Sequence, residues 1–151
     1  MESYPDKIRS LAAGAGNRCD SAAQIAEIIR SIGPYRWAGL YDVTDEMVSN
    51  IAWSGPGAPA FPDFPATKGL TGSAIRDKKA IVVGDVRNDP RYLTNLGNTL
   101  SEIIIPVIHP ASGSVVGTVD VESEKINAFS GDDLKKLEQC AEAALLLWVH
   151  N

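Results

Sequence analysis

Two segments decide the fold that we expect, Ser101-Glu102-Ile103-Ile104-Ile105-Pro106 and, after a short break, Gly117-Thr118-Val119-Asp120-Val121-Glu122-Ser123. Both are typical of strands that bury aliphatic side chains, yet together they carry three carboxylates. A carboxylate inside a sheet is costly to bury unless it meets a cation, another carboxyl group or a ligand. These carboxylates are therefore the main indication of function in the sequence.

The face on which each carboxylate lies follows from strand pairing. Asp120 and Glu122 are two residues apart and share one face. A four-residue loop over Pro110–Gly113 would pair Glu102 with Val121 and leave Glu102 on the other face. A three- or five-residue loop, or a bulge near Pro106, would bring Glu102 to the acidic face, and we expect one of these.

The rest of the chain divides into helices, strands and two long loops. The periodicity predicts helices over Lys7–Ala15, from Asp20 or Ser21 as the cap to about Ile32, over Ser73–Asp77 after Gly69-Leu70-Thr71-Gly72, and from about Gly131 to Val149 after a Ser130 cap. It predicts strands over Tyr35–Val43, Met47–Ser54 and Ala80–Val83. The loops are Gly55–Lys68, with four prolines, and Gly84–Leu100, with one helical turn around Pro90–Thr94.

This order of elements predicts an α+β domain. We expect one central antiparallel sheet, with the N- and C-terminal helices packed on one face and a loop-covered pocket on the other. A length of 151 residues suits a single domain over 1–151.

Composition excludes several classes of function. A net charge of −5 without a basic stripe argues against nucleic-acid binding. No apolar run approaches the ~20 residues that span a bilayer, and the first residues do not form a signal peptide, so we expect a cytoplasmic protein without membrane contact. Cys19 and Cys140 are isolated, so neither a metal site nor another cofactor is expected.

The chain resembles GAF domains along nearly its whole length. The segments that carry the resemblance are Arg36-Trp37-Ala38-Gly39-Leu40-Tyr41, Gly69-Leu70-Thr71-Gly72-Ser73-Ala74, Val82-Val83-Gly84-Asp85-Val86, the two acidic strands, and Phe129-Ser130-Gly131-Asp132-Asp133. Within GAF domains it is most similar to the free methionine-(R)-sulfoxide reductases, which have a Trp-x-Gly-Phe-Tyr segment, a Ser-Glu-Ile-x-x-Pro strand and an Asp-x-Asp-Ser strand.

The resemblance implies a set of ligand-binding residues, which are Trp37, Tyr41, Glu102, Asp120 and Glu122. The last of these replaces an aspartate of the reductases. The resemblance also implies that the catalytic cysteines are missing, since Asn95 and Thr71 occupy the positions of the two loop cysteines, and neither side chain can act as a thiolate. On the residues alone, the carboxylates could equally be solvated, and aromatic residues on a central strand are commonly core residues.

We therefore expect a non-catalytic, sensor-type GAF domain for signal transduction. Its ligand would be an amino-acid-like or otherwise cationic small molecule, because three carboxylates match the three donors of an ammonium group. Trp37 and Tyr41 would bound the apolar part of the ligand or make a cation–π contact. One alternative is a reductase-like enzyme that uses a different thiol. Another is a dimerisation module with an empty pocket. We expect a homodimer through the terminal helices, with Leu145–Trp148 at the interface, and such a dimer can coexist with ligand binding.

Overall fold

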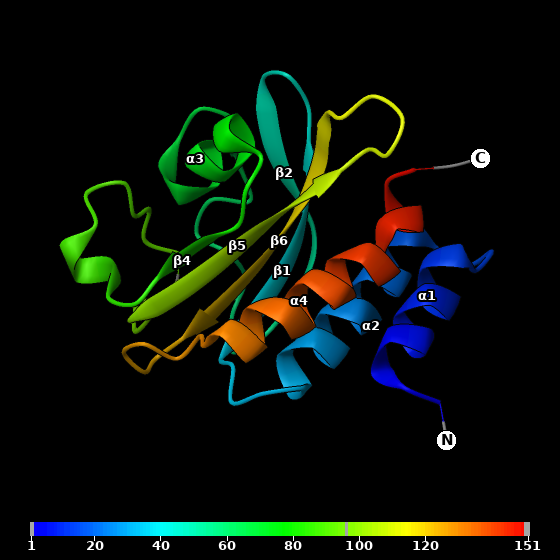
Figure 1. Cartoon of the computed structure of the whole chain (residues 1–151), viewed down its shortest axis with the longest axis horizontal. Helices are drawn as coiled ribbons and strands as arrows, with labels where there is room; N and C mark the ends of the chain where they lie inside the picture. The colour runs from blue at the N-terminus through cyan, green and yellow to red at the C-terminus, as the bar shows by residue number, and fades with distance from the viewer. Residues whose placement is uncertain (1, 96, 150–151) are drawn as a thin grey trace.

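The computed structural model describes residues 2–95 and 97–149 as one curled sheet with helices on both faces (Figure 1). The strands, all antiparallel, follow the order β3-β2-β1-β6-β5-β4 across the sheet. Their bounds are β1 Trp37–Val43, β2 Met47–Ser54, β3 Asp63–Pro65, β4 Ile81–Val83, β5 Ser101–Ile108 and β6 Val115–Ser123. The helices are α1 Tyr4–Ala13, α2 Arg18–Ser31, α3 Gly69–Asp77 and α4 Gly131–Ala143, with 3-10 turns η1 Val86–Asn88 and η2 Leu145–Leu147. The predicted α+β class is confirmed.

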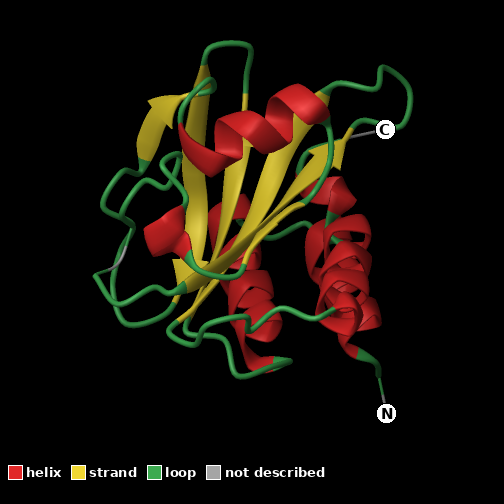
Figure 2. Cartoon of the chain, turned by 60° about the vertical axis from the view of Figure 1, so that its left-hand side comes forward, coloured by secondary structure: helices red, strands yellow, loops and turns green. Residues whose placement is uncertain are grey.

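The helices divide between the two faces of the sheet. Figure 2 shows α1, α2 and α4 on one face and α3 on the other. The main apolar core lies between the sheet and the three helices α1, α2 and α4. There Leu40, Ile103, Val119 and Val121 are buried against helical residues such as Ile25. Alternation along each strand then directs the intervening side chains toward α3 and the two long loops. None of the helices in the described residues is long and apolar enough to cross a membrane.

Local capping sets where the helices begin. Ser3 accepts from the backbone N–H of Asp6 at 3.3 Å, with Pro5 in the first turn, so α1 starts earlier than the predicted Lys7. Asn17, and not Asp20 or Ser21, caps α2, because its Oδ1 accepts from the Asp20 N–H at 3.1 Å. Ser130 caps α4 as predicted, and Asp133 completes a capping box with it.

Four predictions for the helices and loops are wrong. Helix α3 starts at Gly69, not Ser73, and it includes Gly72, where a Cβ would lie 2.5 Å from the carbonyl carbon of Thr67. The proline-rich loop contains the edge strand β3, which pairs only with β2, and edge positions tolerate proline. The helical turn of the second loop is η1, capped by Asp85, and not a turn over Pro90–Thr94. The final helix stops at Ala143, and η2 follows it.

A bulge sets the face of Glu102. The hairpin closes through a four-residue loop, since His109 N–H donates to the Ser114 carbonyl at 2.8 Å and Ile108 pairs with Val115. The register then shifts, and Val107 pairs with Gly117, so Val116 is the extra residue. As a result Glu102 lies directly opposite Glu122. The expected bulge is confirmed, one residue beyond Pro106.

The segment Leu145–Trp148 packs mainly inward. Leu147 is buried, and the Trp148 indole N–H donates to the Tyr41 carbonyl at 3.1 Å. A Cβ at Gly117 would lie 2.2 Å from Trp148 Nε1, so the glycine makes room for this ring. Leu146 remains 37% exposed. The homodimer through the terminal helices stays a prediction, and Leu146 is the residue of this segment best placed to take part.

Candidate functional site

The three predicted carboxylates meet on the face of the sheet opposite α1, α2 and α4. Glu102 lies on β5 directly opposite Glu122 on β6, and Asp120 lies on β6 opposite Ile104. One carboxylate oxygen from each residue lies within 4.8 Å of the others. All three side chains are buried, with exposed fractions of 5%, 6% and 0% for Glu102, Asp120 and Glu122. The bulge thus produces a compact, buried acidic cluster.

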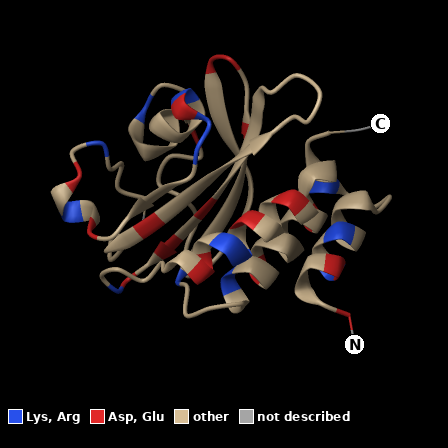
Figure 3. Cartoon of the chain, viewed as in Figure 1, with Lys and Arg blue, Asp and Glu red and all other residues tan. Residues whose placement is uncertain are grey.

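No strand of the described chain supplies a cation to this cluster. Figure 3 shows acidic positions on the sheet, and none of the six strands carries Lys or Arg. Arg36 lies immediately before β1, and its Nε is 3.8 Å from Glu124 Oε2. Its positive charge opposes the rise in the pKa of Glu122. Buried carboxylates without a paired cation are costly, so this arrangement needs either protons or a ligand.

The carboxylates differ in their hydrogen-bond partners. Glu122 is engaged on both oxygens, because Thr99 Oγ1 donates to Oε1 at 2.5 Å and Asn95 Nδ2 donates to Oε2. Asp120 Oδ1, in contrast, is buried and finds no hydrogen-bond partner among the described residues. A buried acceptor without a partner is rare in folded proteins and here points to a missing donor.

Burial raises the pKa of all three carboxyl groups. The pKa of Glu102 lies well above its ordinary value, because burial is reinforced by the charges of Asp120 and Glu122. Burial raises the pKa of Asp120 to about 6, although the neighbouring Glu102 carboxyl group opposes the shift. The pKa of Glu122 rises to about 8 through burial and the charge of Asp120. Near neutral pH the empty cluster therefore retains protons, which a bound cation would displace.

A small cavity lies beside the cluster. It measures about 30 Å³ and is bordered by Tyr41, Glu102 and Asp120 from the sheet, with further walls from α3 and from both covering loops. This volume is close to that of one water molecule, so an amino acid enters only if the covering loops move apart. Phe61 and Leu93 border the cavity from these loops and are 50% and 36% exposed, respectively.

The predicted aromatic pair separates into two roles. Tyr41 borders the cavity, and burial followed by the charges of Asp120, Glu122 and Glu102 raises its pKa, so its hydroxyl stays protonated. Trp37 is fully buried and does not border the cavity. Its indole lies over Gly39 and donates to the Gly57 carbonyl at 3.0 Å. Trp37 therefore supports Tyr41, whose ring centroid is 6.4 Å away, and does not contribute directly to the wall.

The covering loop before β5 contributes three polar residues to the cluster. Two of them, Asn95 and Thr99, are the donors to Glu122. The third is Tyr92, whose hydroxyl is buried without a partner among the described residues, and burial with the charges of Glu122 and Glu102 raises its pKa to about 12. The sequence alone does not mark Thr99 or Tyr92 as site residues. Their polarity and their position in the loop before Ser101 were the only indications in the sequence. An irregular loop has no periodicity from which the direction of a side chain can be predicted.

Thr71 and Asn95, which the resemblance implies lie at the positions of the reductase cysteines, border the cavity, whereas the two cysteines of this chain do not. Cys19 is exposed on α2 and Cys140 is buried in α4, within the core on the opposite face of the sheet. Burial raises the pKa of the Cys140 thiol to about 12, which makes it unreactive.

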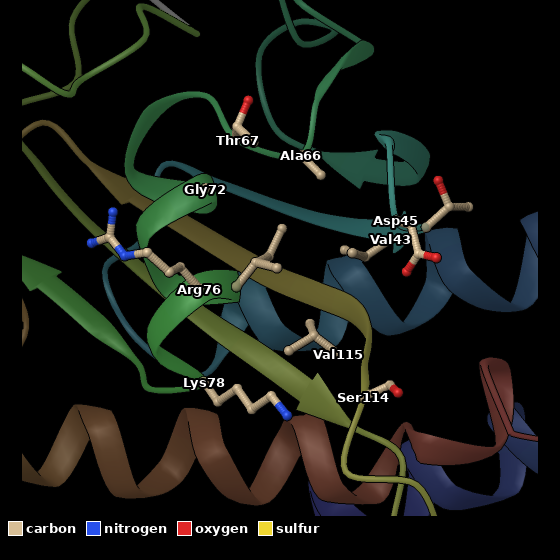
Figure 4. A pocket seen from close by; sticks show the side chains of 11 residues that line it. Val43, Asp45, Ala66, Thr67, Gly72, Arg76, Lys78, Ser114 and Val115 are labelled. Carbon is tan, nitrogen blue, oxygen red and sulfur yellow. The ribbon is translucent and has the colours of Figure 1, made fainter.

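A second hollow lies on the other side of α3. This groove of about 420 Å³ runs between α3 and the ends of two hairpins, and Figure 4 shows Arg76 and Lys78 on one side of it and Asp45 on the other. Arg76 is exposed and already paired with Asp77 at 3.1 Å. The groove holds none of the acidic cluster, and its charges are open to solvent. The buried cavity is therefore the stronger candidate for a specific site.

Comparisons with known proteins agree with these features. A model of the GAF domain matches residues 20–146. The chain is 28% identical to GAF domain-containing protein A of Dictyostelium discoideum over 139 residues, which cover 91% of this chain and 85% of that protein. It is 32% identical to the free methionine-R-sulfoxide reductase of Saccharomyces cerevisiae over 108 residues, covering 70% of this chain and 59% of the enzyme.

A solved structure extends the similarity to the whole fold. The type II free methionine-R-sulfoxide reductase from Thermoplasma acidophilum superposes with a TM-score of 0.77 at 26% identity, and the match covers 93% of this chain and 94% of the enzyme. The chain is thus similar in sequence and in structure both to GAF domains in general and to these reductases.

Proposed function

Because this chain belongs to the GAF domain family, we propose that it is a small-molecule receptor of the sensor type, whose ligand is amino-acid-like or carries another compact cation. The observation that carries the proposal is Asp120 Oδ1, a buried acceptor to which none of the described residues donates, in an acidic cluster at the edge of a cavity. An ammonium group would donate to this oxygen. It would also neutralise carboxylates that the strands leave without a cation.

The wall of the cavity suits the rest of such a ligand. Tyr41 and Phe64 meet edge to face with centroids 6.0 Å apart, and both border the cavity. With Phe61 and Leu93 they form the apolar part of the cavity lining. A molecule with an ammonium group at one end and a short apolar chain at the other would satisfy both sides. Opening and closing of the covering loops on binding would then provide the signal.

The positions of the cysteines favour binding over reduction. Sulfoxide reduction needs a thiolate next to the bound sulfur, and the cavity wall has Thr71 and Asn95 where the resemblance places the reductase thiols. The two thiols of the chain belong to helices on the other face of the sheet. We therefore propose that the domain binds its ligand without turnover.

Calorimetric titration tests this function directly. The ligands are free methionine, both epimers of methionine sulfoxide, and arginine, and each is titrated into the wild type, Glu102→Gln and Asp120→Asn. Binding that is lost in both variants supports the carboxylate site. The matched control is Glu27→Gln on α2, an exposed glutamate that should leave binding unchanged. Absence of heat with all four ligands would refute the amino-acid-like class.

The similarity to the reductases makes sulfoxide reduction the second candidate. Incubation of the protein with free methionine-(R)-sulfoxide and dithiothreitol or thioredoxin decides between the two. We expect no methionine above the rate without protein. Turnover that disappears in Cys19→Ser would overturn the receptor proposal in favour of an enzyme with a relocated thiol.

A further inference from the structure

One side chain connects the acidic cluster to both covering loops. Asn95 Nδ2 donates to Glu122 on β6, and Asn95 Oδ1 accepts from the backbone N–H of Ala60 at 3.2 Å. Ala60 belongs to the loop between β2 and β3, whereas Asn95 belongs to the loop before β5. Two loops that are 35 residues apart in the sequence therefore meet at Asn95, beside the cavity that they cover.

The same contact changes the role of Glu122. Its second oxygen accepts from Thr99, so both oxygens are engaged by the loop before β5. The cavity, in turn, is bordered by Glu102 and Asp120 and not by Glu122. The cluster is thus divided into two carboxylates that face the cavity and one that holds the covering loop.

We infer that Asn95 is a positioning residue that clasps the two covering loops over the cavity through Glu122, leaving Glu102 and Asp120 to bind the cation of the ligand. Ligand enters when the bond between Asn95 and Glu122 opens. The identity of the ligand rests on the proposed function, but the clasp itself does not.

The chemistry of the amide is what the clasp requires. Asn95 donates to a carboxylate with its amide nitrogen and accepts from a backbone N–H with its amide oxygen, so the two ends of one amide group serve both contacts. An aspartate at this position still accepts from Ala60 but cannot donate to Glu122, and above about pH 8, where Glu122 is ionised, it places a second negative charge against it. The substitution Asn95→Asp therefore removes the bond to Glu122 and keeps the bond to Ala60 between the two loops.

Hydrogen exchange of the Ala60 amide, followed by NMR without ligand, tests the clasp. In Asn95→Asp we expect this exchange to become roughly tenfold faster, since the loops open more often although the acceptor for Ala60 is retained. The neighbouring, exposed Asn98→Asp is the matched control and should exchange like the wild type. Asn95→Ala, which adds no charge, should also accelerate exchange.

A reciprocal exchange of the two groups provides the decisive variant. In Asn95→Asp combined with Glu122→Gln, the glutamine amide donates to the aspartate, and the slow exchange of Ala60 should return. Unchanged exchange in Asn95→Asp overturns the inference. Failure of the double variant to restore slow exchange also overturns it, because this pair has neither charge repulsion nor a missing donor, so the acceleration would then not depend on the contact between positions 95 and 122.

Ligand binding supplies an independent readout. If free methionine binds, stopped-flow measurements should show its association and dissociation both faster in Asn95→Asp, with Glu102 and Asp120 intact. Altered Ala60 exchange without any ligand binding would support the clasp and refute the proposed ligand class. Methionine binding with unaltered Ala60 exchange would refute the clasp alone.

Discussion

The substitution Glu122→Gln should stabilise the folded protein relative to the wild type, and this difference in the free energy of unfolding should grow as the pH rises. Glutamine retains the shape of glutamate and one acceptor oxygen, so one of the two hydrogen bonds from Thr99 and Asn95 is lost, at a cost of about 1 kcal/mol at every pH. In contrast to glutamate, it cannot ionise in the buried cluster. Burial and the charge of Asp120 raise the pKa of Glu122 from 4.5 to about 8 in the folded protein. The folded state therefore binds a proton at Glu122 more tightly than the unfolded state does. The stability that this proton contributes is fully present below about pH 4.5 and is lost as the pH rises toward 8.

The size of the effect follows from the same values. Each pH unit between the unfolded and folded pKa corresponds to about 1.4 kcal/mol, which sets an upper limit of about 5 kcal/mol for Glu122 at pH 8. Glu102 and Asp120 share protons with Glu122, so part of this cost stays in the variant. We expect Glu122→Gln to match the wild type within about 1 kcal/mol at pH 5 and to exceed it by about 2 to 4 kcal/mol at pH 8.

Urea unfolding followed by tryptophan fluorescence at pH 5, 6.5 and 8 measures this difference. Glu27→Gln, at an exposed position on α2, controls for the general effect of removing one negative charge. Parallel pH profiles of the wild type and Glu122→Gln would refute the reasoning, since they would mean that Glu122 has an ordinary pKa and that the cluster is hydrated in solution.

Three further results are expected. A cation that binds the cluster displaces protons from carboxyl groups of raised pKa, so methionine should bind more tightly at pH 8 than at pH 6. Its titration should also be more exothermic in Tris than in phosphate, and equal enthalpies would contradict proton release. Gly39→Ala places a Cβ 2.2 Å from Trp37 Cη2 in a buried site, and urea unfolding should show a loss of about 1 to 3 kcal/mol, whereas Gly131→Ala, with open space around it, should show none. Light scattering should give the mass of a dimer for the wild type and of a monomer for Leu146→Glu, and a monomeric wild type would contradict the predicted interface.

The elements that the sequence predicted best are those with a local cause. Strand β2 spans Met47–Ser54, as its alternation predicted, and Ser130 caps α4 through a side chain three residues away from its partner. The elements predicted poorly depend on distant partners. Strand β3 exists because β2 offers an edge, and α3 begins early because Gly72 fits against the backbone of Thr67.

The candidate site divides in the same way. The fold class and the three carboxylates could be predicted from the sequence, because alternation and residue type are local properties that strand pairing preserves. Tertiary structure decided which of the five predicted residues border the cavity. A bulge at Val116 turned Glu102 toward Asp120, Gly39 allowed Trp37 to lie flat in the core, and Asn95 and Thr99 reached Glu122 from a loop without periodicity. Each of these depends on a contact between segments distant in sequence, which no local pattern encodes.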